Sequence, residues 1–229
     1  MSLASAGARL ESIGPAPGGR PCNAVSEVLV KRFEGVAKPA TLAAGIVFII
    51  GGLLDQVLRL GADPASEIVQ TPLYALRSVA LLGGALLLIL ALVSIYERHA
   101  RKIGPFGFSA AIVAGTGTIL ISGLFWAEAF LYPTLGRVAP ELLDGDVRPG
   151  SSSFGLLLSA AVFGVGWILL GSAMLRARVY RVLPAVLLVV GGAVSVLPTT
   201  AIGQAVLGVG LVLLAFSPTY RKHEGPQRS

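Results

Sequence analysis

Four ionisable side chains lie inside or at the edges of long apolar stretches of the sequence: Asp55, Arg59, Arg77 and Glu128. An unpaired charge at the centre of a lipid bilayer costs about 2.5–3.5 kcal/mol on insertion scales, so such residues usually pair, reach water or serve a function. Asp55 and Arg59 are one helical turn apart and can pair along their own helix. Arg77 can reach Glu128 or Asp55 from a neighbouring helix.

Three interpretations of these charges are open. In the first, they form interhelical salt bridges near the membrane surface and have a purely structural role. In the second, they line a polar cavity open to the outside of the cell, and the ligand-binding candidates are then Asp55, Arg59, Arg77, Glu128, Tyr132 and Gln204, with Thr199 and Thr200 beside them. In the third, they are simply exposed and unpaired.

The composition places the chain among membrane proteins. Of its 229 residues 54% are hydrophobic and 13% are charged, whereas a soluble domain carries about 25% charged residues. The apolar residues form blocks, and a block of roughly 18 or more can cross a hydrocarbon core about 30 Å thick. The sequence therefore predicts an all-α integral membrane protein.

We expect a six-helix transmembrane bundle. Residues 182–216 are too long for one crossing, and Pro198-Thr199-Thr200 offers a turn near the middle. A re-entrant hairpin is the alternative for this stretch. The expected spans are 40–60, 73–95, 108–131, 154–175 and the two halves of 182–216.

The distribution of charge predicts the orientation of these spans. Arginine and lysine are concentrated at the N-terminal side, in the 96–107 and 176–181 loops and in the C-terminal tail, while the 61–72 loop has only acidic charges. Basic loops stay in the cytoplasm, so both termini are expected there. At 1.5 Å per residue, the four ionisable residues then fall in the outer half of the bilayer. Arginine outnumbers lysine, as in GC-rich bacteria, so we expect the bacterial cell (plasma) membrane.

Four regions are expected along the chain. Residues 1–22 are rich in Gly, Pro, Ser and Ala and predict a disordered tail. Residues 23–38 have apolar positions at three- and four-residue spacing, typical of a short amphipathic helix lying on the membrane interface. The alternative is a cytosolic helix that packs on the loops. Residues 39–217 form the transmembrane domain and 218–229 a cytoplasmic tail.

The third expected span carries a stripe of small residues at four-residue steps: Ala110, Ala114, Thr118 and Ser122. Membrane helices associate where small side chains let backbones approach closely. The stripe therefore predicts helix packing and a central place for this span. Association with a second copy or a membrane partner through the stripe is the alternative.

Absent motifs narrow the chemistry. The two histidines, His99 and His223, lie in expected cytoplasmic segments, so the sequence offers no intramembrane pair for haem. The single cysteine, Cys22, excludes an internal disulfide and a cysteine metal cluster. Metal-hydrolase, serine-hydrolase and phosphate-binding signatures are missing from the sequence. We expect no metal, no cofactor and no nucleic-acid partner; the expected partner is the lipid bilayer.

These observations favour a non-enzymatic role. The first hypothesis is a membrane protein that binds or moves a small ligand through the outward-facing cavity, or serves as an accessory membrane subunit. The second is an intramembrane enzyme that uses Glu128 or Asp55 as a general acid on an apolar, lipid-like substrate. The third is a structural protein that oligomerises through the stripe.

Overall fold

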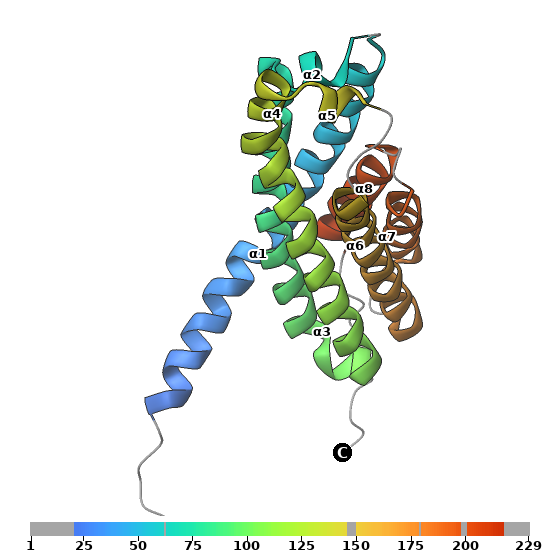
Figure 1. Ribbon diagram of the computed structural model, residues 1–229. Helices are drawn as coiled ribbons and strands as arrows, with labels where there is room; N and C mark the ends of the chain where they lie inside the picture. The colour runs from blue at the N-terminus through green and yellow to red at the C-terminus, as the bar shows by residue number, and fades with distance from the viewer. Residues whose placement is uncertain (1–20, 62, 146–149, 179, 198–200, 218–229) are drawn as a thin grey trace, which may run out of the picture.

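The computed structural model describes residues 21–61, 63–145, 150–178, 180–197 and 201–217 (Figure 1). Every regular element among them is a helix. Four helical stretches are long and apolar enough to cross a membrane: Val36–Arg59, Pro72–Tyr96, Lys102–Val138 and Ser153–Ala177. The architecture is consistent with a helical membrane protein, the class that composition predicts.

The helices follow one another with short connections. In chain order they are α1 (Pro21–Arg59), α2 (Ala65–Ile68), α3 (Pro72–Trp126), the π-helix η1 (Ala127–Leu131), α4 (Tyr132–Val138), α5 (Glu141–Asp144), α6 (Gly150–Ala177), α7 (Val182–Ser195) and α8 (Ala201–Phe216).

Helix α3 is a hairpin of two arms that reverses at Gly104. This residue has φ 66° and ψ −165°, a backbone conformation that glycine adopts without steric cost. Pro105 follows and begins the second arm, where its missing N–H costs no hydrogen bond. The rings of Tyr96 and Phe108, which lie on either side of the turn, are 5.7 Å apart, so the two arms run antiparallel. The expected 96–107 loop is therefore helical on both sides of Gly104.

The first arm of α3 packs antiparallel to α1. A Cβ atom placed on Gly51 of α1 would lie 2.4 Å from the side chain of Leu81, and one placed on Gly84 would lie 2.7 Å from Val47. Only hydrogen at these glycines allows such close approach, which is how membrane helices gain packing energy. Glycine spacing thus sets the register between α1 and α3.

The remaining long helices close a ring around the core. The second arm of α3 packs on α6, α6 on α7, and α7 on α8, which returns to α1. At the closure, a Cβ on Gly45 of α1 would lie 2.8 Å from the carbonyl oxygen of Gly208 of α8. The two backbones are therefore in direct contact.

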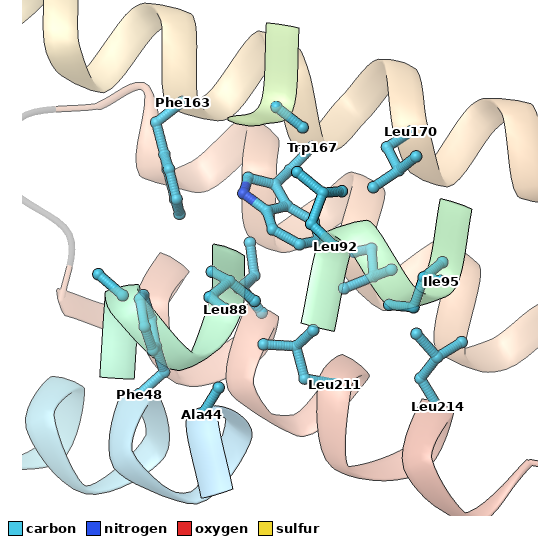
Figure 2. Close-up of a cluster of buried hydrophobic side chains, with 14 of the residues drawn as sticks. Ala44, Phe48, Leu88, Leu92, Ile95, Phe163, Trp167, Leu170, Leu211 and Leu214 are labelled. Atoms are coloured by element: carbon cyan, nitrogen blue, oxygen red, sulfur yellow. The ribbon is translucent and has the colours of Figure 1, made fainter. Parts of the chain in front are cut away.

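Aromatic and aliphatic side chains fill the interior of this ring (Figure 2). The rings of Phe48 and Phe163 stack with centroids 6.5 Å apart, and Trp167 is fully buried beside them. Leu88 and Leu211 are also fully buried. The core thus joins α1, α3, α6 and α8 along the ring axis.

The N-terminal region differs from the expected separate helix. Residues 23–38 belong to α1, which continues through Pro39 without interruption into the apolar segment. In Figure 1 this N-terminal half of α1 extends away from the other helices. Its location on a membrane surface stays a prediction. Of the expected tails, residues 1–20 and 218–229 lie outside the described residues, while Pro21 and Cys22, expected in the N-terminal tail 1–22, belong to α1.

The last two helices are short. Helix α7 has 14 residues and α8 has 16, which correspond to roughly 21 and 24 Å at 1.5 Å per residue. The helices separate where the sequence predicts a break, although Pro198, Thr199 and Thr200 lie outside the described residues. Their lengths are below the roughly 30 Å of a hydrocarbon core, so spanning and re-entrant arrangements both stay predictions.

Helical structure continues past the expected end of the third span at Leu131, through η1 and α4 to Val138. The point at which this helix leaves the membrane stays a prediction. In η1 the amide of Tyr132 bonds the carbonyl of Ala127, five residues back. Pro133 follows and has no N–H with which to continue the ordinary ladder, which explains a π-turn at this point. Beyond it, α4 and α5 pack with α2 at the same end of the molecule (Figure 1); α2, α4 and α5 are called the cap below.

Candidate ligand-binding site

Arg77 stands at the centre of a buried ion cluster. Its Nη2 lies 2.9 Å from Oδ1 of Asp55, and its Nη1 lies 2.7 Å from Oε2 of Glu128. Nε of Arg59 lies 2.7 Å from Oδ2 of Asp55. The sequence predicts that Arg77 pairs with Glu128 or Asp55; in the structure it pairs with both. Helices α1 and α3 and the π-turn η1 are thereby linked through one guanidinium.

Local structure explains why these side chains meet. The close contact of Gly51 with Leu81 brings α1 against the first arm of α3, and Asp55 and Arg77 each lie one turn from that contact. Glu128 reaches Arg77 from η1, where the wider turn resets the direction of the side chains. Tyr74 lies one turn before Arg77, with its ring centroid 5.7 Å from the guanidinium carbon. This distance is within the range of a cation–π contact.

The members of the cluster differ sharply in exposure. The side chain of Arg59 is 59% exposed, whereas those of Asp55, Arg77 and Glu128 are 9%, 5% and 15% exposed. Both oxygens of Asp55 are occupied by arginines. The charge that this cluster presents to solvent or to a ligand is therefore mainly positive.

A cavity of about 640 Å³ adjoins the cluster. Typical sites for one small ligand have 300–1,000 Å³, mostly apolar walls and a few polar groups. This cavity has that character. Its polar lining is Asp55, Arg59, Tyr74, Arg77, Glu128, Tyr132, Ser153, Ser195 and Gln204, and its apolar lining includes Phe48, Ile121, Phe125, Leu156, Leu157 and Phe163.

The cap covers one end of the cavity with apolar side chains, namely Ala65, Ile68, Val69 and Leu143. Its helices are joined by Asp144, which accepts hydrogen bonds from the hydroxyl and the amide of Ser66 at 2.5 and 2.8 Å. The pKa of Asp144 is lowered below its usual value, mainly by the hydrogen bond from the hydroxyl of Ser66 and next by the bond from its amide. Gln70 adds a bond to the carbonyl of Gly136 at 3.2 Å.

The structure brings most of the predicted binding residues to this cavity. Tyr132 and Gln204 line it together with the four charged residues, and Oε1 of Gln204 is buried without a partner among the described residues. Thr199 and Thr200 lie outside the described residues. The geometry leaves the binding role of each residue a prediction.

Several lining residues are missing from the sequence-based candidates. Tyr74 precedes Arg77 by three residues, and this spacing on a helix places the two on one face, a signal that was available. Ser153 and Ser195 line the opposite wall. They give no such signal, because isolated serines are common in membrane helices and only the packing of α6 and α7 brings them here.

The small-residue stripe lies inside the chain. Ala114 and Thr118 are fully buried, and a Cβ on Gly166 of α6 would lie 2.5 Å from Cα of Ala114. The hydroxyls of Thr118 and Ser122 donate hydrogen bonds to the backbone carbonyls of Ala114 and Thr118, one turn back, each at 2.7 Å. Ala110 is 1% exposed. The stripe therefore faces neighbours within the same chain, and its association with a second copy stays a prediction.

Among the described residues, no group of three or more His, Cys, Asp and Glu side chains could hold a metal ion. Comparisons with models of protein families, with curated proteins and with solved structures find no match to this chain. The site is therefore interpreted from its own geometry.

Proposed function

We propose that this protein is a multi-pass membrane protein that binds a small ligand in the cavity beside Arg77, either to move it or as an accessory membrane subunit. One observation carries the proposal. A cavity of about 640 Å³ with largely apolar walls ends at a cluster of four ionisable side chains, three of which are largely buried. This combination of apolar volume and a few fixed polar groups is typical of ligand sites.

Packing alone is a poor explanation for the cluster. Replacing a buried ion pair by well-packed apolar residues is often neutral or stabilising, because desolvation of the charges offsets their attraction. A helix interface built by glycine contacts therefore gains little from the charges of Asp55, Arg77 and Glu128. Ionisable groups inside membrane segments are instead a common mark of ligand pathways.

For the topology we propose six crossings with both termini in the cytoplasm of a bacterial cell, and with the cap on the outer face of the plasma membrane. The antiparallel ring of helices and the alternation of basic and acidic loops support this arrangement. Residues 23–38 would then lie at the inner interface. Asp144→Cys in a Cys22→Ser background should react with an impermeant maleimide on intact cells; labelling only after lysis would contradict the orientation.

The geometry supports binding more than acid catalysis. A general acid must carry a proton and place it on the substrate. Both oxygens of Asp55 contact arginines, so Asp55 would have to release one before donating a proton, and Oε2 of Glu128 contacts Arg77 at 2.7 Å.

The cavity can be tested by filling it. Ala160 of α6 lines the cavity, whereas Val165 on the same helix is 45% exposed and does not line it. Wild type, Ala160→Phe and Val165→Phe should be purified in mild detergent, and the small molecules released on heating identified by mass spectrometry. We expect a compound that is enriched with wild type and Val165→Phe over empty micelles and is lost with Ala160→Phe. Equal amounts from all three proteins would refute binding in this cavity.

A further inference from the structure

We propose that the ligand of this cavity is a single-chain amphiphile with an anionic head group, a carboxylate or a phosphate, that binds Arg59. Its chain lies between the apolar walls formed by α1, α3 and α6. This inference rests on the proposed binding function and specifies the chemistry of the ligand.

The sign of the head group follows from which charges are accessible. The side chain of Arg59 is 59% exposed, and its Nε alone takes part in the bond to Asp55. An arginine exposed to this extent can bind a carboxylate or phosphate through its terminal nitrogens. Asp55 and Glu128 are at most 15% exposed, and Arg77 contacts both. A cationic head group would find no equally accessible partner in this part of the described structure.

Hydrogen-bonding capacity at the cluster points the same way. Arg77 lines the cavity, and its side chain is only 5% exposed. Its Nε is buried and has no partner among the described residues. A buried donor left without an acceptor costs about 1–3 kcal/mol. A ligand that supplies acceptor oxygens relieves this cost. Oε1 of Gln204, on α8, is also buried without a partner among the described residues; it is an acceptor, so it would take a donor group of the ligand and does not itself favour an anion.

The acidic residues of the cap do not reverse this preference. Glu67, Glu141 and Asp144 are exposed and are absent from the lining of the cavity. Apart from Tyr132 of α4, the cap contributes apolar side chains to the lining, such as Ile68 and Leu143.

The size and polarity of the cavity indicate one chain. A volume of about 640 Å³ is within the range of sites that enclose a single small ligand. The apolar lining includes Leu156 and Leu157 of α6 and adjoins three almost fully buried phenylalanines of the core, Phe48, Phe125 and Phe163. Each buried CH₂ contributes about 0.8 kcal/mol, so an alkyl chain placed here supplies most of the affinity and the head group supplies selectivity.

Four probes with one chain and different head groups test the proposal: hexadecanoate, hexadecyl phosphate, hexadecanol and hexadecyltrimethylammonium. Binding to the full-length protein in nanodiscs should be measured by native mass spectrometry, with empty nanodiscs as background. We expect both anions to bind about tenfold more tightly than the alcohol, and the ammonium to bind most weakly. The difference between the carboxylate and phosphate probes identifies the preferred anion.

Two variants locate the head group. Arg59→Gln should reduce the affinity for the anions to that of the alcohol, and it should fold because Asp55 keeps its bond to Arg77. Arg137→Gln removes an exposed arginine of α4 that does not line the cavity, and it should leave all affinities unchanged.

The outcomes separate this inference from the proposed function. If the ammonium probe binds most tightly, or if the anion-to-alcohol ratio survives Arg59→Gln, the anionic head group is refuted while binding in the cavity stands. If none of the four probes binds although the cavity-filling variant loses a co-purified compound, the amphiphile is refuted and the cavity stands. If both experiments are negative, the proposed function fails as well.

Discussion

Replacing Arg77 by methionine tests whether the ion cluster holds the helices together. Methionine approximates the volume of the arginine stem, so the substitution removes the charge without opening a large void. Asp55 keeps Arg59 at 2.7 Å after this change. Glu128 loses its salt bridge to Arg77, at 2.7 Å, which is its only salt bridge among the described residues.

The expected cost follows from the environment of Glu128. Removing one partner of a buried ion pair typically costs 3–5 kcal/mol, because the other charge is left uncompensated. Glu128 is 15% exposed and borders the cavity, so water can reach it in part, and we expect the lower end, about 3 kcal/mol. For a chain of this length, about 3 °C per kcal/mol translates this into a fall of roughly 10 °C in the midpoint of thermal unfolding.

Thermal unfolding of the purified protein in one detergent at one scan rate measures the effect, because unfolding of membrane proteins is often irreversible. The matched control is Arg137→Met, an exposed arginine outside the cluster, which should change stability by no more than about 0.5 kcal/mol. The double variant Arg77→Met/Glu128→Leu removes the stranded carboxylate. It should therefore recover most of the lost stability.

Two results would contradict this reasoning. One is a fall of less than about 3 °C for Arg77→Met, which would mean that the salt bridges contribute no more than an exposed pair. The other is a double variant that is as unstable as the sum of both single variants, since this would show that Arg77 and Glu128 act independently.

Two further predictions concern the α3 turn and the cap. Gly104→Ala should cost about 1–3 kcal/mol in thermal unfolding, because φ 66° with ψ −165° is a conformation open essentially to glycine only. A Cβ there meets nothing within 4 Å, so the cost is backbone strain alone. Gly83→Ala, at an equally open helical site, should instead be neutral or stabilising by up to about 1 kcal/mol, and the same effect at both sites would refute the role of Gly104. The lowered pKa of Asp144 means that its bonds to Ser66 stabilise the cap fully above the unfolded value, about pH 4, and are lost as pH falls through the lower folded value. The protection of the amides of residues 141–145 against hydrogen exchange, corrected for the intrinsic pH dependence of exchange, should thus fall in acid for wild type and be low at all pH values for Asp144→Asn; a flat wild-type profile of protection would contradict this assignment.

The cluster has a consequence for the architecture as well as for binding. Arg77 joins α1 to η1, and η1 leads directly into the cap through α4. A ligand head group that binds Arg59 would touch the same network through Asp55. The ion pairs therefore run from the exposed Arg59 to η1, the element that directly precedes α4 of the cap.

Sequence alone determined the class of the protein and predicted the half of the bilayer in which its charges lie. Long apolar blocks require helices in a bilayer, because backbone groups there must be bonded within their own segment. Residue counting at a fixed rise predicted Asp55, Arg77 and Glu128 in the same, outer half, since a helix converts position along the chain into height. The break near Pro198 was predicted in the same way, from local chemistry.

The tertiary structure decided what sequence could not reach. That Arg77 bridges two carboxylates, that Arg59 remains exposed and that Ser153 and Gln204 share their cavity all depend on how each helix is rotated and shifted against its neighbours. Those settings come from contacts such as Gly51 with Leu81, which join residues far apart in the chain. Hydropathy and spacing are short-range properties of one segment, so they specify how high a side chain lies but not what it faces.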